Sequence, residues 1–238
     1  MPVERFFVDS QLMQNEELTL SDQEFHHLAH VTRAKVGDIV ELVNGRGALA
    51  SAQVKRIEKK QAILKIEDAV HSLKPSVEVI LAQAIPRINR LDFILEKGTE
   101  LGMSQIWLFP ASQSERKELT QHQIERMRTI TVSAIKQCGR LYLPEIVLKP
   151  PLAQWKKPEQ LSFFGDLDPS APFLNEIWRK EAFIESVLFY IGPESGFTSD
   201  EIIKLCALGA TGVRLHANIL RADTAALAAL SILMHQIL

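Results

Sequence analysis

The sequence has few cysteines, little net charge and no long apolar run. Only two of its 238 residues are cysteine, Cys138 and Cys206, so at most one disulfide bond is possible. Both lie in otherwise apolar helical patterns, and we expect buried free thiols in a reducing compartment. No apolar stretch approaches the roughly 18 residues that a membrane-spanning helix needs. These features exclude a disulfide-framed secreted domain and argue against a helical membrane protein.

The N-terminus and the charge balance further limit the classes of protein to which this sequence can belong. The first nine residues lack the apolar core and the small-residue cleavage site of a signal peptide, so we expect a cytoplasmic protein. Lys and Arg number 27 and Asp and Glu number 29, which gives a formal net charge of −2. Any nucleic-acid partner must therefore be held by a local basic patch. With 46% hydrophobic and 24% charged residues, the composition is that of a folded globular protein.

The hydrophobic pattern changes near residue 72. Before that point, short apolar runs alternate with turn residues, which predicts a small barrel or curled sheet over residues 1–72. An Asn-Gly pair at Asn44 and Gly45 separates two of these runs and predicts a tight hairpin in which both residues have φ > 0. One helical patch covers residues 22–33.

From residue 73 to residue 238, apolar strands alternate with helices of 10 to 15 residues. This alternation is typical of an α/β domain with a parallel sheet. We predict strands over residues 77–82, 105–109, 161–164, 187–191 and 212–215, and helices over residues 91–101, 124–138 and 224–238. The last helix is apolar on nearly every face, so we expect it to be buried in a core or against another subunit.

The most informative motif follows the predicted strand at residues 187–191. It begins with residues 192–196, Gly-Pro-Glu-Ser-Gly, and continues to Thr198 and Glu201, which have the spacing of a helix capping box. The loop therefore lies at the carboxyl end of a parallel strand, where open α/β sheets bind ligands. Its small residues let backbone groups approach a ligand, with the carboxylate of Glu194 nearby. A plain strand-to-helix turn is the alternative, which explains one glycine and the cap.

A second segment with ligand-binding character covers residues 215–225, at the end of the next predicted strand. Asp223 is placed to cap the final helix, a bland structural role. Arg221 stands between an apolar segment and a helix start, where an arginine suits bidentate recognition of a phosphate or carboxylate. Two such segments at neighbouring strand ends favour one shared site.

Three other patterns lack the structural context that their functions need. Gly45 begins a G-x-G-x-x-A sequence, but it lies in a hairpin and opens no helix, which argues against dinucleotide binding. A hydrolase nucleophile elbow has glycine two residues before and two residues after its serine, and Ser195 has Pro193 and Phe197 at these positions. His26 and His30 are spaced i, i+4, but no third ligand is near, so we predict no metal site.

Several ordered segments match a known family over nearly the whole chain. They are Arg5-Phe6-Phe7-Val8, residues 27–38, Gln83-Ala84-Ile85-Pro86, and residues 96–102, 115–116, 137–140, 192–197 and 219–225. On these segments the chain resembles the ribosomal RNA small subunit methyltransferase E family. That family comprises S-adenosylmethionine-dependent SPOUT enzymes that methylate N3 of a uridine in 16S rRNA.

The resemblance implies a PUA-like RNA-binding barrel over residues 1–72 and a SPOUT methyltransferase domain over residues 73–238. The second domain would be α/β, with a parallel sheet and a C-terminal trefoil knot. In this family the knot holds the cofactor through backbone groups of three loops. By motif match, the cofactor-binding residues are Gly165, Gly192, Pro193, Glu194, Gly196, Leu215, Ile219 and Leu220. The implied partners are 16S rRNA within the small ribosomal subunit and a second copy of the chain in a homodimer.

The chain departs from the family pattern near the implied cofactor site. Ser195 stands where the family usually has a second glycine, and His216 and Asn218 lie in a segment that is usually Leu-Gly-Pro-Arg. Asp223 stands where a glutamate is usual. These departures leave two alternatives open. One is a non-catalytic RNA-binding or ribosome-assembly factor that kept the fold, and the other is a SPOUT enzyme for another rRNA position.

The implied reaction sets the expected residue roles. N3 of uridine carries a proton and is a poor nucleophile, so the site needs a base or a cation that stabilises the uridine anion. We expect Arg221 to stabilise this anion or anchor a phosphate, and Glu194 and Asp223 to act near the ring or orient Arg221. The residues expected to contact RNA are Arg5, Arg33, Arg87, Arg116 and Arg140.

Overall fold

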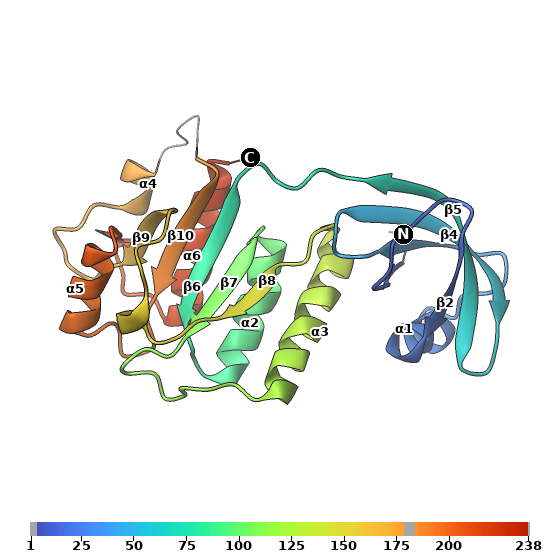
Figure 1. The fold of residues 1–238 in the computed structure, drawn as a ribbon, viewed down its shortest axis with the longest axis horizontal. Helices are drawn as coiled ribbons and strands as arrows, with labels where there is room; N and C mark the ends of the chain where they lie inside the picture. The colour runs from blue at the N-terminus through green and yellow to red at the C-terminus, as the bar shows by residue number, and fades with distance from the viewer. Residues whose placement is uncertain (1–3, 179–183, 238) are drawn as a thin grey trace. The chain divides into compact units, whose positions relative to one another are not determined.

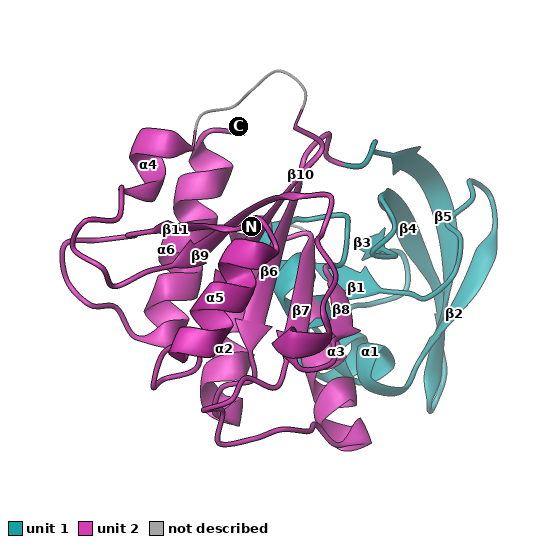
Figure 2. Ribbon diagram, turned by 60° about the vertical axis from the view of Figure 1, so that its left-hand side comes forward, with its two compact units in different colours: residues 1–74, 132–143 teal, residues 75–131, 144–238 magenta. Residues whose placement is uncertain are grey.

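A computed structural model describes residues 4–178 and 184–237, which divide into two compact units (Figure 2). Unit 1 comprises the chain up to Lys74 together with residues 132–143. Unit 2 comprises residues 75–131 and the chain from Pro144 onward. The domain limits 1–72 and 73–238 stay predictions. No helix in the described part of the chain is long and apolar enough to cross a membrane.

Unit 1 contains a five-stranded sheet and a short helical segment (Figure 1). Its elements are β1 (Arg5–Phe7), β2 (Glu17–Ser21), α1 (Asp22–His26), a π-helical turn (His27–Val31), β3 (Ile39–Val43), β4 (Ala48–Ile57) and β5 (Gln61–His71). The strand order is β1-β3-β4-β5-β2, in which β1 and β3 are parallel and the other neighbours antiparallel. Phe6, Leu42 and Leu64 are fully buried in its core. The predicted sheet and helical patch are confirmed.

The predicted hairpin between β3 and β4 is confirmed, but its turn has another geometry. Gly45 has φ +68°, whereas Asn44 is absent from the described residues with positive φ, so the prediction that both residues have φ > 0 is wrong. Instead, Oδ1 of the buried Asn44 accepts hydrogen bonds from the backbone N–H of Arg46 at 2.9 Å and of Ala48 at 3.2 Å. The side chain thereby replaces the backbone pairing of a tight turn.

Unit 2 contains a six-stranded, fully parallel sheet in the order β11-β9-β10-β6-β7-β8. Its elements are β6 (Glu78–Ala84), α2 (Ile88–Glu100), β7 (Gln105–Phe109), α3 (Gln121–Cys138), β8 (Glu145–Leu148), a 3₁₀ turn (Leu152–Gln154), β9 (Leu161–Gly165), α4 (Leu174–Ile177), β10 (Ser186–Ile191), α5 (Ser199–Ala207), β11 (Thr211–Val213) and α6 (Ala222–His235). The last part of α3, from residue 132, belongs to unit 1. The predicted parallel sheet, its five predicted strands and the three predicted helices are confirmed. Leu238, the end of the predicted last helix, lies outside the described residues.

Helices cover both faces of this parallel sheet (Figure 1, Figure 2). Side chains alternate along β6, so that Val79 and Leu81 face one core while Ile80 and Ala82 face the other. The first core also receives side chains from α2, α3, α4 and α6, and the second receives them from α5 and the 3₁₀ turn. Leu230 of α6 is fully buried, which confirms that the last helix packs into a core.

The two cysteines do not match the expectation from the sequence. Cys138 ends α3 and Cys206 lies in the last turn of α5, and both are free and exposed. The prediction of buried thiols is therefore wrong. An apolar helical pattern identifies a buried face, but each cysteine lies on the solvent-facing side of its helix.

The Asn44 turn provides a test of the first unit. Asn44→Ala leaves two backbone N–H groups without their acceptor, and we expect the free energy of unfolding to fall by about 1–3 kcal/mol. Asn44→Asp keeps an acceptor oxygen and should cost less. Thermal unfolding of both variants measures the difference. An alanine variant as stable as the aspartate variant would show that the side chain does not hold the turn.

Candidate functional site

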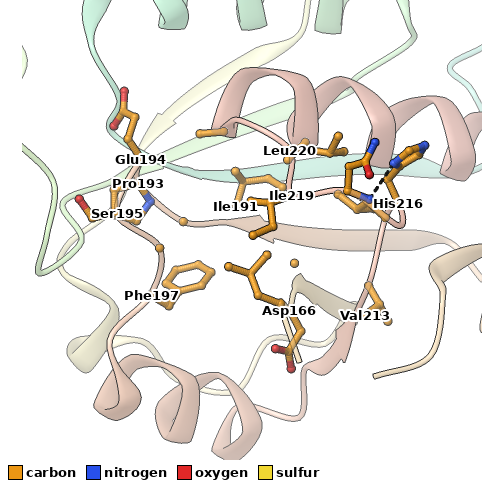
Figure 3. A pocket seen from close by; sticks show the side chains of 18 residues that line it. Asp166, Ile191, Pro193, Glu194, Ser195, Phe197, Val213, His216, Ile219 and Leu220 are labelled. Carbon is orange, nitrogen blue, oxygen red and sulfur yellow. Dashed lines mark hydrogen bonds between the residues drawn. The ribbon is translucent and has the colours of Figure 1, made fainter. Parts of the chain in front are cut away.

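A cavity of about 210 Å³ opens at the carboxyl ends of β9, β10 and β11 (Figure 3). Three loops and the start of α6 line it, and the loops cover residues 165–167, 191–197 and 213–220. Most lining residues are apolar or glycine. The polar lining residues are Asp166, Glu194, Ser195, His216 and Asn218. An apolar cavity with a few polar groups is the usual form of a small-molecule site.

The register of the sheet brings the three loops together. β9 lies between β10 and β11, with Phe164 paired to Tyr190 on one side and to Gly212 on the other. Because the three strands are parallel, their following loops leave the same edge of the sheet. The backbone N–H of Asp166 donates to the carbonyl of Val213 at 2.8 Å and ties the first loop to the third.

Two glycines shape the loop that follows β10. Gly196 has φ +80°, a conformation that residues with a side chain rarely adopt. A Cβ atom on Gly192 would lie 3.2 Å from the backbone nitrogen of Phe197, so the loop folds closely on itself at that point. The N–H of Gly196 donates to the carbonyl of Pro193 at 2.8 Å and closes the turn. The wall of the cavity is therefore formed here largely by backbone.

The predicted capping box at the start of α5 is confirmed, and it fixes the far end of this loop. Oγ1 of Thr198 accepts from the N–H of Glu201 at 3.3 Å, and Oε2 of Glu201 accepts from the N–H of Thr198 at 2.9 Å. Oε1 of Glu201 accepts from the N–H of Ser112 at 2.8 Å. Burial alone would raise the pKa of Glu201, but these hydrogen bonds together outweigh burial and lower it. Glu201 is thus a buried carboxylate that joins two loops.

All eight residues predicted to bind a cofactor line this one cavity, namely Gly165, Gly192, Pro193, Glu194, Gly196, Leu215, Ile219 and Leu220. Their role as cofactor ligands stays a prediction. Asp166 also lines the cavity and was missed by sequence reasoning. Its position two residues after the predicted strand 161–164 was the available signal. Its Oδ1 accepts from the N–H of Asp168 at 3.0 Å.

The residues predicted for catalysis lie in and beside the cavity. Glu194 lines it, whereas Arg221 and Asp223 do not. Leu220 and Ala222 both line the cavity, so Arg221 between them lies at its rim. Arg221 is exposed, and in the described part of the chain its side chain has no hydrogen bond or ion pair.

Asp223 does not cap the final helix. The N-cap residue of α6 is Arg221, so Asp223 is the second helical residue and the predicted capping role is wrong. Its Oδ1 accepts from the N–H of Thr224 at 2.9 Å, a contact within its own turn. An aspartate in the first turn still interacts favourably with the helix dipole.

Glu194 contacts the start of α2. Nη1 of Arg90 lies 3.5 Å from its Oε1, and the backbone N–H of Arg87 donates to the same oxygen at 3.4 Å. The side chain of Arg87 turns to Glu115, with Nε 3.1 Å from each carboxylate oxygen. The hydrogen bond from Arg87 lowers the pKa of Glu115. Glu194 therefore connects the loop after β10 to a group of charged side chains at the rim.

Of the four residues that depart from the family pattern, Ser195, His216 and Asn218 line the cavity and Asp223 does not. Nδ1 of His216 accepts from the N–H of Asn218 at 3.0 Å, as the dashed line in Figure 3 shows. The imidazole thereby closes a turn of its own loop. Ser195 is exposed at the opposite loop and has no hydrogen bond in the described part of the chain.

The arginines predicted to contact RNA are divided between the units. Arg5 binds Glu41 through Nε at 2.6 Å, and Arg33 is exposed, both in unit 1. Arg140, predicted with the larger domain, lies in the segment that packs with unit 1, where burial lowers its pKa. Arg87 and Arg116 lie exposed in unit 2. Their contact with RNA stays a prediction.

Comparison with protein families identifies the chain. A family model described as an RNA methyltransferase domain matches residues 73–234, and one described as an RNA methyltransferase PUA domain matches residues 20–67. The chain belongs to this RNA methyltransferase family. The resemblance drawn from the sequence is confirmed, as are the α/β fold and the PUA-like first domain. The knot stays a prediction. Among the described residues, no group of three His, Cys, Asp or Glu side chains could hold a metal ion.

Individual relatives agree with this assignment. A protein of Buchnera aphidicola named ribosomal RNA small subunit methyltransferase E is 28% identical over 97% of this chain and 92% of its own length. A protein of the same name from Neisseria gonorrhoeae, solved bound to S-adenosyl methionine, is 26% identical, with a TM-score of 0.84 over 96% of this chain and 95% of that one. A methyltransferase from Legionella pneumophila, 24% identical, shares the fold with a TM-score of 0.88 over 99% and 98% of the two chains.

Glu201 makes the stability of the site dependent on pH. Because its folded pKa is lowered, its stabilising contribution is present above the unfolded pKa of about 4.3 and is lost as the pH falls through the lower folded value. Glu201→Gln should lower the free energy of unfolding at pH 7 by about 1–3 kcal/mol. Thermal unfolding of both proteins from pH 7 to pH 3 measures this. The gap between them should close at the acid end, and a constant gap would contradict the assignment.

Proposed function

We propose that this protein transfers a methyl group from S-adenosyl-L-methionine to N3 of a uridine in the 16S rRNA of the small ribosomal subunit. It acts in the cytoplasm as a homodimer. One observation carries the proposal: in a chain of the RNA methyltransferase family, all eight residues expected to bind the cofactor line one cavity. The S-adenosyl methionine bound by the Neisseria gonorrhoeae relative, at 26% identity, supports the choice of cofactor.

The chemistry of the cavity lining fits this cofactor. Apolar side chains such as Ile191, Phe197 and Leu220 suit an adenine ring, and backbone groups of the glycine loop suit its polar edge. The carboxylate of Asp166 can accept hydrogen bonds from ribose hydroxyls, and that of Glu194 offsets positive charge. When bound, the cofactor supplies a methyl group on a positively charged sulfur.

The residues at the rim of the cavity would act on the nucleophile, N3 of the uridine. Transfer forms a bond between N3 and the methyl carbon, breaks the carbon–sulfur bond so that its electron pair returns to sulfur as a neutral thioether, and releases the N3 proton to water. Arg221, exposed at the rim, would stabilise the negative charge that develops on the uracil ring. Asp223 lies two residues further along, at the start of α6, and would orient Arg221. Glu194, already bound by Arg90 and by the N–H of Arg87, would position the cofactor loop. Alignment of nitrogen, carbon and sulfur would supply most of the acceleration.

RNA recognition would rest on local arginines because the net charge of the chain is −2. Arg5, Arg33 and Arg140 of the first unit, with Arg87 and Arg116 of the second, would contact phosphates. Without a strong overall attraction, we expect weak and salt-sensitive binding to naked RNA, and tighter binding to a structured ribosomal particle that adds shape contacts.

Gly196 provides a test of cofactor binding. Gly196→Ala forces a side chain into a left-handed conformation, which costs about 1–2 kcal/mol and should weaken S-adenosylmethionine binding about 5- to 30-fold. Ser195→Ala, beside it, should change affinity less, because it removes a hydroxyl without a hydrogen bond in the described part of the chain and does not force the backbone into a strained conformation. Isothermal titration calorimetry measures both. Failure of the unmodified protein to bind at millimolar cofactor would favour a non-catalytic ribosome-assembly factor.

Arg221 provides a test of the reaction itself. Arg221→Ala should lower single-turnover methylation of unmethylated 30S particles about 10²- to 10³-fold, because it removes a preorganised positive group. Affinity for the cofactor should be unchanged, and Arg221→Lys should retain part of the rate. Mass spectrometry of the nucleosides locates the methyl group. A methylated ribose, or an undiminished rate in the alanine variant, would overturn the proposed chemistry.

A further inference from the structure

Arg90 has a mostly covered side chain whose guanidinium makes few polar contacts. Only 19% of the side chain is exposed, and in the described part of the chain its one ion pair, with Glu194, is 3.5 Å long. Ion pairs between a guanidinium and a carboxylate are typically about 2.7–2.9 Å long. A guanidinium carries five N–H donors, and the nitrogens of Arg90 are not among the buried polar atoms without a partner in the described residues, so donors remain accessible for a further partner. Arg90 is therefore suited to gain an anionic partner at the rim of the cavity.

Arg87, three residues earlier, already binds an anion through its guanidinium fork, the pair of nitrogens Nε and Nη2. Nε lies 3.1 Å from both oxygens of Glu115, and Nη2 lies 2.5 Å from Oε1. This is the two-pronged geometry in which arginine binds carboxylates and phosphates alike. Both side chains are exposed, at 58% and 60%, and an ion pair this exposed contributes little to stability. Glu115 can therefore be exchanged for another anion at little cost.

The charges around these side chains favour such an exchange. Besides the contact with Arg87, the positive charges of Arg116 and Arg90 both lower the pKa of Glu115, so three arginines act electrostatically on this carboxylate. The backbone N–H of Arg87 binds Glu194, which lines the cavity. The arginine group is thus anchored directly to the wall of the proposed cofactor site.

We propose that Arg87 and Arg90 form a subsite for a phosphodiester group of the substrate RNA, adjacent to the target nucleotide. Glu115 occupies the fork of Arg87 in the free protein, and the RNA phosphate replaces it. The subsite rests on the proposed function, since it assumes an RNA whose target base enters the neighbouring cavity. At Arg87 the RNA phosphate replaces the carboxylate of Glu115. The same phosphate supplies Arg90 with hydrogen-bond acceptors, so both guanidinium groups are paired in the complex.

Removal of the competing carboxylate tests the subsite. Glu115→Gln should bind unmethylated 30S particles about three- to fivefold more tightly, the effect expected for release of an exposed ion pair. The dependence of log affinity on log salt concentration should steepen by about one counterion, since Arg87 is then free to neutralise a phosphate. Affinity for S-adenosylmethionine should not change.

Asp92→Asn is the matched control. Asp92 forms a comparable ion pair with Arg126, at 2.7 Å, in which the arginine is 57% exposed, close to the 58% of Arg87, while the carboxylate of Asp92 is more covered, at 21% against 60% for Glu115. Both substitutions remove one negative charge from unit 2, so they change the overall attraction to RNA equally. If Glu115→Gln binds 30S particles no more tightly than Asp92→Asn, the proposed exchange is wrong.

Arg90 is tested separately. Arg90→Ala should weaken 30S binding about tenfold and reduce the salt dependence by about one counterion. Arg90→Lys should restore part of the affinity, which a defect in folding would not allow. A loss of cofactor affinity without a change in RNA binding would mean that Arg90 only supports Glu194, and would overturn its place in the subsite.

The subsite and the proposed function fail in different ways. If the unmodified protein neither binds 30S particles nor methylates their 16S rRNA, the proposed function is wrong. If it does both, but Glu115→Gln behaves as Asp92→Asn and Arg90→Ala binds RNA normally, only the phosphodiester subsite is wrong.

Discussion

The parallel pairing of β9 with both β10 and β11 is the constraint on which the site depends. It directs three chain segments, separated by long stretches of sequence, to one edge of the sheet. A hydrogen bond from Asp166 to Val213 ties the first of these loops to the third, and one from Ser112 to Glu201 ties the start of α5 to the loop after β7. The sheet is buried on both faces, so the strand ends are fixed while the loops remain accessible. Rigid strands with accessible loops are what a preorganised binding site requires.

The sequence predicted the regular elements of this arrangement well, because each is encoded by neighbouring residues. The alternation between short apolar strands and longer helices gave the parallel sheet, and Thr198 with Glu201 gave the start of α5. The β10 loop was recognised because glycine, proline and a carboxylate follow a strand directly. All these signals span fewer than about a dozen residues, over which local physics and the final fold agree.

Features that depend on distant residues could not be predicted in this way. The hydrogen bond from Arg87 to Glu194 joins residues 107 positions apart, and no local pattern marks Arg90 as their neighbour. Asp166 gave a weak signal because a single aspartate after a strand is common in turns. Asn44 misled because its side chain, rather than a backbone conformation, closes the hairpin. The burial of Cys138 and Cys206 was predicted wrongly because an apolar helical pattern does not show which face of the helix each cysteine occupies.

The charges at the rim explain how a nearly neutral protein can act on RNA selectively. A strongly basic surface binds any polyanion, whereas here Arg87 is paired with Glu115 and Arg90 with Glu194. Such pairs keep the arginines ordered and weaken their attraction to distant phosphates, since each carboxylate cancels the field beyond a few ångströms. Only a phosphate delivered in contact with the fork gains enough to replace a carboxylate. In the proposed function, shape would bring the RNA into place first and charge would then act at short range, which would link recognition of a folded particle to chemistry in the cavity beside it.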